Sequence, residues 1–289
     1  MPRLVLTLEA FVTRSTLDRY VQRRTALADY FFSGVAGASE AEYLRAAGVQ
    51  HVLVDPTDLK NAAGFTHVVL DSGAYRCFKR AVPLDPAAYQ TFARGAAADW
   101  HLAPDVIGDP VATERNWDQF RQPTMVPVWG FGSDRRLLHK YLDASERVAI
   151  GGLVTRMREK DKMMLRELTA LCEEFPRRFH VLGANWLRAA CQLRELISSL
   201  DSAEWLVGGR YGFVVFLNTR SRQLQRAPAR VLGLAHLTRA ERNIACAQAI
   251  NAFFNGCRAA TVPGNTVWPS VGTKGWQFVP VSSQKSASN

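Results

Sequence analysis

Acidic side chains directly follow short apolar segments at several points of this sequence. Asp71 comes directly after the apolar run His67–Leu70, and Asp105 follows Trp100–Ala103 with only Pro104 between them. An apolar run of this length predicts a buried strand, which places the following acid at the rim of a sheet, where α/β folds hold their chemistry. A carboxylate at such a rim can act as a nucleophile or transfer a proton. Asp71 with Ser72 is also typical of a helix N-cap, so that interpretation stays open.

The same pattern of a strand followed by a functional residue type recurs further along the chain. The acid–serine pair Asp201–Ser202 repeats the pair at Asp71, while Met125–Gly130, Arg147–Gly152 and Phe179–Gly183 each end in glycine. The carboxyl ends of parallel strands meet on one face of a fold. We therefore expect these residues to gather around one site.

Strand-like segments alternate with amphipathic segments, which indicates βα units and a parallel sheet. The expected strands are Leu4–Leu8, His51–Val54, His67–Leu70, Trp100–Ala103, Val126–Trp129, Val148–Ile150, His180–Leu182 and a short strand near Leu200. The expected helices are Glu40–Ala47, Asp85–Gly95, Ala112–Arg121, Arg135–Leu142, Arg156–Glu174 and Trp186–Ser199. About eight strands favour one (β/α)₈ TIM-type barrel over residues 1–281, followed by a polar tail over 282–289. An open doubly wound sheet is less favoured, because no G-x-G-x-x-G turn follows the first strand.

The composition is typical of one intracellular protein with a sizeable core. The chain has 289 residues, 47% of them hydrophobic, and its five scattered cysteines indicate reduced thiols in a cytoplasmic protein. Glu9 interrupts the apolar N-terminal run too early for a signal peptide or a membrane span. We expect a cytoplasmic protein without a membrane partner.

The balance of charges favours a polyanionic partner. The chain carries 36 Lys and Arg against 26 Asp and Glu, a formal net charge of +10. The segment 210–230 contains no acid, and its arginines are Arg210, Arg220, Arg222, Arg226 and Arg230. Arginine suits bidentate contacts with phosphate, so we interpret this segment as one wall of a nucleic-acid groove. The alternative is an ordinary solvated basic surface.

Four of these segments resemble motifs of the tRNA-guanine transglycosylase superfamily. Asp71–Tyr75 is similar to the family's "DSGGF" motif, Ile150–Val154 to "GGLAVGE" and His180–Gly183 to "YLMGVG". Leu200–Trp205 resembles "FDCVLPTR", and more closely the archaeal form with "DSA". The motifs occur in the family's order over residues 66–222. The resemblance implies a (β/α)₈ barrel that exchanges guanine for a 7-deazaguanine base in a polynucleotide.

The chain departs from the tRNA-specific members of this family in its metal-ligating residues. Those members carry a C-x-C-x-x-C zinc motif and a later histidine, whereas this region has only His236, Cys246 and Cys257, at spacings unlike a structural zinc site. We interpret the two cysteines as residues of a helix face and expect no metal and no cofactor. The chain is most similar to the compact zinc-free branch found in phages and bacterial modification islands. That branch implies insertion of a base such as 7-cyano-7-deazaguanine into DNA, in the host cytoplasm if the gene is a phage's. The target guanine must leave the stack, either in a single strand or flipped out of a duplex.

The resemblance also implies roles for individual residues. Asp201 matches the nucleophile that attacks C1′ of the sugar, and Asp71 matches the general acid/base. Asp105 matches the carboxylate that binds the guanine edge, with Asp109 as its competitor. We expect five more residues to bind the base. Tyr75 and Trp129 would stack on its ring, the backbone of Gly151 and Gly152 would approach it closely, and Ser72 is the fifth. A tight βα turn explains the glycines equally well, and ordinary packing explains the aromatics.

Two further functions remain compatible with the sequence. One is a transglycosylase that acts on tRNA, against which the missing zinc motif argues. The other is a nucleic-acid-binding barrel without catalysis, in which the acids are helix caps. The sequence leaves open the oligomeric state, the deazapurine and the preferred DNA sequence.

Overall fold

Parallel strands form the centre of the structure, a computed structural model that describes residues 27–154, 161–218, 221 and 223–256 and the backbone of 267–272 and 275–280. The strands of the central sheet are β1 (Asp29–Phe32), β2 (His51–Val54), β3 (His67–Leu70), β4 (Trp100–Leu102), β5 (Met125–Val126), β6 (Val128–Gly130), β7 (Val148–Gly151), β8 (Phe179–Val181) and β9 (Ser199–Ser202). Their order is β5-β4-β3-β2-β1-β9-β8-β7-β6, and every pairing is parallel.

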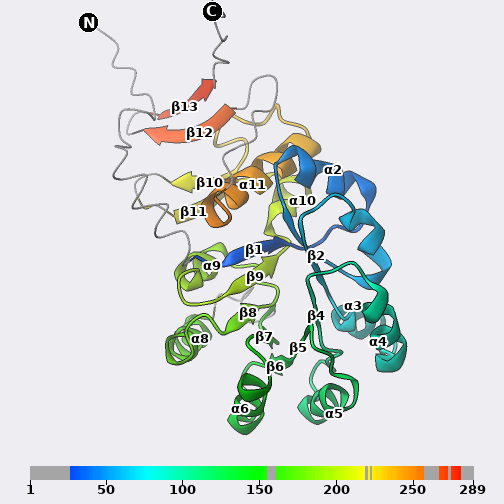
Figure 1. Cartoon of the computed structure of the whole chain (residues 1–289). Helices are drawn as coiled ribbons and strands as arrows, with labels where there is room; N and C mark the ends of the chain where they lie inside the picture. The colour runs from blue at the N-terminus through cyan, green and yellow to red at the C-terminus, as the bar shows by residue number, and fades with distance from the viewer. Residues whose placement is uncertain are drawn as a thin grey trace, which may run out of the picture.

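The two strands at the ends of this order are neighbours in the sequence. Only Pro127 separates β5 from β6, and the Pro127 carbonyl still accepts a hydrogen bond of 2.8 Å from the Ala149 N–H. The sheet is therefore nearly closed and barrel-like, with helices around it (Figure 1). This architecture is compatible with the expected TIM-type barrel, although the sheet has nine segments and not eight.

Helices flank the sheet and run back between successive strands. They are α2 (Ala38–Ala46), α3 (Ala74–Arg80), α4 (Pro86–Gly95), α5 (Pro110–Phe120), α6 (Arg135–Ala144), α8 (Lys162–Glu174), α9 (Leu187–Leu193), α10 (Val207–Tyr211) and α11 (Arg239–Phe254), with two 3₁₀ turns, η2 (Pro56–Ala62) and η3 (Glu204–Leu206). Aspartate caps begin several of them: Asp85 accepts hydrogen bonds from the first turn of α4, and Asp134 does the same for α6.

The first strand of the sheet differs from the expectation. β1 is Asp29–Phe32, a short aromatic strand between β2 and β9. The expected strand Leu4–Leu8 and the expected tail 282–289 lie outside the described residues. The other expected strands of the sheet are present, except that Val126–Trp129 is divided at Pro127 into β5 and β6.

Alternation along the strands divides the apolar side chains into two layers. One buried cluster takes a residue from each of several neighbouring strands and fills the barrel: Phe31, Leu53, Val69, Leu102, Val126, Val128 and Ala149. The residues on either side of these in the strands belong to a larger cluster, packed against the helices. The residue after each strand's last outward side chain therefore points inward, above the barrel core.

Two antiparallel hairpins lie outside the barrel sheet: β10 (Phe213–Asn218) with β11 (Gln223–Pro228), and β12 (Val267–Gly272) with β13 (Gly275–Pro280). The first packs on α11 through the buried Cys246, whose Sγ accepts a hydrogen bond of 3.3 Å from the Val215 N–H. Cys246 is thus a core residue of a helix, as expected, while Cys257 lies outside the described residues. Within the described ranges, no helix is long and apolar enough to cross a membrane.

Candidate active site

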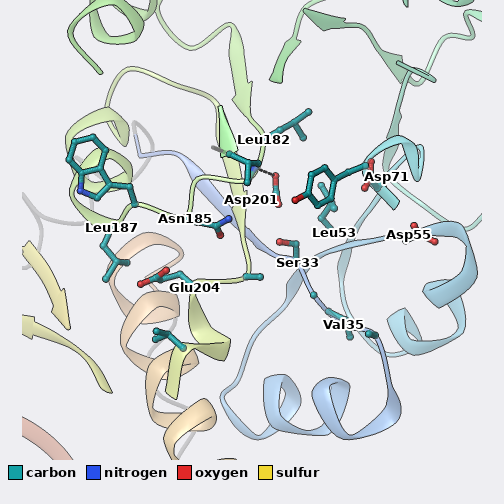
Figure 2. A pocket seen from close by; sticks show the side chains of 18 of the residues that line it. Ser33, Val35, Leu53, Asp55, Asp71, Leu182, Asn185, Leu187, Asp201 and Glu204 are labelled. Atoms are coloured by element: carbon teal, nitrogen blue, oxygen red, sulfur yellow. Dashed lines mark hydrogen bonds between the residues drawn. The ribbon is translucent and has the colours of Figure 1, made fainter. Parts of the chain in front are cut away.

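A cavity of about 900 Å³ opens at the carboxyl ends of the strands. Its wall includes the residues that follow strands in the inward phase: Ser33 after β1, Asp55 after β2 and Asp71 after β3, with Asp201 within β9. Figure 2 shows these side chains turned toward one space from several strands. Asp71 and Asp201, which the sequence pattern singled out, are therefore brought together, because strand alternation turns both toward the inside of the barrel.

Asp71 and Asp105 form the first acidic pair of the cavity. Burial and, to a smaller extent, the carboxylates of Asp105, Asp201 and Asp55 together raise the pKa of Asp71 from 3.8 to about 7. Burial also raises the pKa of Asp105 from 3.8 to about 6, against a hydrogen bond from Ser72 that lowers it. Near neutral pH, Asp71 can therefore both donate and accept a proton.

Ser72 holds Asp105 in place. Its Oγ donates a hydrogen bond of 3.2 Å to Asp105 Oδ1 and accepts one of 3.2 Å from the Ala74 N–H. Ser72 is buried, whereas Asp105 reaches the cavity. The expected base-binding residue Ser72 thus lies behind the cavity wall and orients the acid that faces it.

Asp201 is buried, with 5% of its surface exposed, and lies across the cavity from Asp71 (Figure 2). Its Oδ1 accepts a hydrogen bond of 2.8 Å from the Gly183 N–H. Gly183 has a φ of +63°, and a Cβ there would come within 2.7 Å of Val154, so this close approach requires glycine. The carboxylate is consequently held in one orientation by the backbone.

His180 is a second neighbour of Asp201 that the sequence pattern did not identify. Its Nε2 lies 3.6 Å from Asp201 Oδ1, and its Nδ1 lies 2.8 Å from Ser199 Oγ. Burial lowers the pKa of His180, and the nearby carboxylate opposes this shift. Only the pairing of β8 with β9, which places His180 opposite Ser199, reveals the contact.

Asn185 is another cavity residue that the sequence did not reveal. Ser202 Oγ accepts a hydrogen bond of 3.1 Å from the Glu204 N–H and donates one of 2.8 Å to Asn185 Oδ1. Because the amide oxygen faces Ser202, the amide nitrogen is left for the cavity, as Figure 2 shows. Asn185 can therefore donate a hydrogen bond to a ligand.

Arginines line the rim of the cavity on the side of β11 and α10. Arg210 and Arg226 of the basic segment both lie there. Arg226 pairs with the buried Glu204 at 2.8 Å and covers the Phe213 ring, with 5.7 Å between its Cζ and the ring centroid. Arg230 is exposed outside the cavity lining, and the expected contacts Arg220 and Arg222 lie outside the described residues.

On the opposite rim of the cavity, Arg76 forms ion pairs with two aspartates. Arg76 binds Asp55 at 2.9 Å and Asp58 at 2.5 Å, and it also donates to Thr57 Oγ1. Asp55 could have been found from the sequence, because it follows the strand His51–Val54 just as Asp71 follows His67–Leu70.

The sequence matches no protein-family model and no curated protein. What the protein does must therefore be inferred from the chemistry of this cavity. Among the described residues, no group of three or more His, Cys, Asp and Glu side chains is placed to hold a metal ion.

Two expected base-binding residues lie elsewhere. Asp109 is exposed outside the cavity lining, where its side chain caps α5 through a hydrogen bond of 2.9 Å from the Ala112 N–H. Trp129 is 3% exposed, packs beneath the helices, and donates from Nε1 to the Asp134 carbonyl at 3.2 Å. Trp129 occupies an outward position of β6, so the expectation that it stacks on a base in the cavity is wrong.

The remaining expected residues do line the cavity. Gly151 and Gly152 form one part of its wall, and Tyr75, on the first turn of α3, forms another. A Cβ at Gly151 would lie 3.3 Å from Val128, so a side chain there would crowd the barrel core as well as the cavity. The cavity thus has Asp71 and Asp201 facing each other and Asp105 beside Asp71. Its wall also contains glycine backbone without side chains, and arginines lie at its rim.

Proposed function

We propose that this protein exchanges guanine in DNA for a 7-deazaguanine base such as 7-cyano-7-deazaguanine, in the cytoplasm. The observation that carries the proposal is the pair Asp71 and Asp201, which face one cavity from the ends of β3 and β9. Exchange of a base at C1′ needs a nucleophile on one side and a proton carrier on the other. The two carboxyl groups suit these separate tasks because their surroundings differ.

Asp201 is the nucleophile in this proposal. Its carboxylate attacks C1′ as the bond from C1′ to the guanine nitrogen breaks, giving a glycosyl ester through an oxocarbenium-like transition state. The Gly183 N–H holds Oδ1, and no backbone group of the described residues binds Oδ2, so we take Oδ2 as the attacking oxygen. The incoming base then displaces the ester and regenerates the carboxylate.

Asp71 carries the proton. It protonates the departing guanine and then takes the proton released by the incoming base, so that each cycle leaves it unchanged. A pKa of about 7 supports transfer in both directions near neutral pH.

In this proposal, Asp105 binds the edge of the base that carries the ring N–H and the 2-amino group. A carboxylate accepts hydrogen bonds from the ring N–H and the 2-amino group that guanine and 7-deazaguanines share. Gly151 and Gly152 expose backbone to the other edge of the base, and Tyr75 covers a ring face. Asp109 takes no part, because it caps α5.

The proposal extends to the fold and the partner. We take β5, Pro127 and β6 as one interrupted strand of a (β/α)₈ barrel, supported by the hydrogen bond from Ala149 to Pro127. The exposed arginines at the rim support a polyanionic partner.

Base exchange by the purified protein tests the proposal. Labelled guanine is supplied with DNA or with tRNA, and label retained in the polymer is measured for the wild type and for Asp201→Asn. We expect incorporation into DNA that Asp201→Asn abolishes. Incorporation into tRNA at an equal or higher rate would replace DNA as the partner, and no incorporation into either polymer would refute the exchange reaction.

A further inference from the structure

An exposed apolar stripe leads away from the cavity along α3. Tyr75 is 44% exposed, Phe78 is 57% exposed, and Val82 beyond the helix is 48% exposed. Residues three apart lie on the same side of a helix, so Tyr75 and Phe78 share a face. Tyr75 lines the cavity and Phe78 does not, so the stripe starts at the cavity and runs outward.

The charges on α3 match a polyanion. The helix contains Arg76, Lys79 and Arg80 and no acid. Arg76 is used by Asp55 and Asp58, which fixes the helix to the cavity rim. Lys79 and Arg80 are exposed and, within the described part of the chain, form no ion pair. Phe78 therefore lies beside free positive charge, an arrangement that binds unpaired nucleotides through ring stacking and phosphate contact.

The other side of the cavity repeats this combination. Tyr211, at the end of α10, is 70% exposed and lines the cavity next to Arg210. Arg188, on α9, is a second exposed arginine of the same rim. In the sheet order, β2 and β1 lie between β3, which precedes α3, and β9, which precedes α10. The exposed rings of Phe78, on α3, and Tyr211, on α10, thus lie on different sides of the cavity.

We propose that the protein binds its nucleic acid as a single strand, with the target nucleotide in the cavity and its two neighbours stacked on Phe78 and Tyr211. This inference rests on the proposed base exchange in DNA. Stacking on an exposed ring needs a base whose face is free, which a paired duplex does not offer beside the target. Lys79 and Arg80 contact phosphates on the α3 side, and Arg188 and Arg210 do so on the other.

The test uses DNA oligonucleotides that carry 2-aminopurine next to the target guanine, on its 5′ or its 3′ side. Stacking on an aromatic ring quenches the fluorescence of this base. Wild type, Phe78→Ala, Phe78→Trp and Tyr211→Ala are titrated with single-stranded and duplex forms. Phe92→Ala is the matched control, because Phe92 is a 41% exposed aromatic residue on α4 outside the cavity lining.

We expect the wild type to bind the single strand more tightly than the duplex and to quench 2-aminopurine on both sides. Phe78→Ala should lose quenching on one side only and bind about tenfold more weakly, equivalent to about 1.4 kcal/mol. Tyr211→Ala should lose it on the other side, while Phe78→Trp and Phe92→Ala should behave as the wild type.

Equal affinity for duplex and single strand, unchanged quenching in Phe78→Ala, or no DNA binding at all would each overturn this inference. Labelled-guanine exchange is measured on the same preparations. Exchange without loss of quenching in the alanine variants removes only the stacking sites, whereas single-strand stacking without any exchange removes the proposed function and leaves the binding mode standing.

Discussion

The Asn255 side chain completes the hydrogen bonding of Tyr30, 225 residues earlier in the chain. The Tyr30 N–H donates to Asn255 Oδ1 at 2.8 Å, and Asn255 Nδ2 donates to the Tyr30 carbonyl at 3.0 Å. β1 pairs with β2 only at Phe32 opposite Val52, so the amide of Asn255 takes the place of a strand residue beside Tyr30. The end of α11 is thereby joined to the first strand of the sheet.

Asn255→Ala should therefore destabilise the protein by about 2–4 kcal/mol, because it leaves two backbone groups of a central strand without partners. Urea unfolding followed by circular dichroism measures the change. Gln119→Ala, at an exposed position of α5, is the control and should stay within about 0.5 kcal/mol of the wild type. Equal stability of the two variants would mean that water replaces Asn255 without cost.

Asp201→Asn should abolish formation of the covalent sugar ester and lower exchange by several orders of magnitude, because an amide cannot attack C1′. Mass spectrometry of protein mixed with DNA detects the ester, and rapid quenching measures exchange. DNA binding should remain, since the arginines at the rim are untouched. More than a few per cent of wild-type exchange in this variant would remove Asp201 from the mechanism.

The rate of ester formation should fall as the pH rises through about 7, because the first step consumes the proton on Asp71. Single-turnover measurements between pH 5.5 and pH 9 are the appropriate test. Asp71→Asn should be slow at every pH and should lack this inflection. An inflection that persists in Asp71→Asn would assign the proton to another group of the cavity.

The same carboxyl group should reduce stability at alkaline pH. The folded protein raises the pKa of Asp71 from 3.8 to about 7, so it holds this proton more tightly than the unfolded chain does. The resulting stabilisation is full below about pH 4 and is lost as the pH rises through about 7. At pH 8, Asp71→Asn should thus have a free energy of unfolding about 1–3 kcal/mol higher than the wild type. Near pH 4 the two proteins should be similarly stable. Urea unfolding at both pH values measures the difference.

DNA affinity should fall steeply with salt, because arginines at the cavity rim displace counterions from phosphates. Arg210→Gln should lower the slope of log affinity against log salt by about one, whereas Arg121→Gln, after the far end of α5, should leave it unchanged. Titrations between 50 and 300 mM salt measure the slopes. Equal slopes for all three proteins would place the DNA away from Arg210.

The sequence predicted the parts of the fold that local patterns control. Apolar runs followed by acids located β3 and β9, because burial and strand length are visible in a few residues. Which face of the sheet a side chain takes is harder to predict. Val128 points into the barrel core, so the next residue, Trp129, faces the helices. β1 was missed because Tyr30–Phe32 is short, and an apolar run at Leu4–Leu8 offered an alternative first strand.

Contacts between distant segments were beyond the sequence pattern. His180 meets Asp201 only because β8 pairs with β9, and Glu204 meets Arg226 only because the hairpin β10–β11 folds over η3. The basic segment was interpreted as one wall of a nucleic-acid groove, yet alternate residues of β10, Val214 and Phe216, are buried under the loop that precedes α11. A single sequence contains the residues of such contacts but not their partners.

The position of β1 also determines when the protein can finish folding. β1 lies between β2 and β9, and its backbone is completed by Asn255. A chain growing from its N-terminus therefore leaves the aromatic strand Asp29–Phe32 half-paired until β9 and Asn255 have been made. Pairings this far apart in sequence form slowly, and unpaired strands bind to one another meanwhile. We therefore expect the unpaired edge of β1 to stay open to such contacts until β9 and α11 have been made.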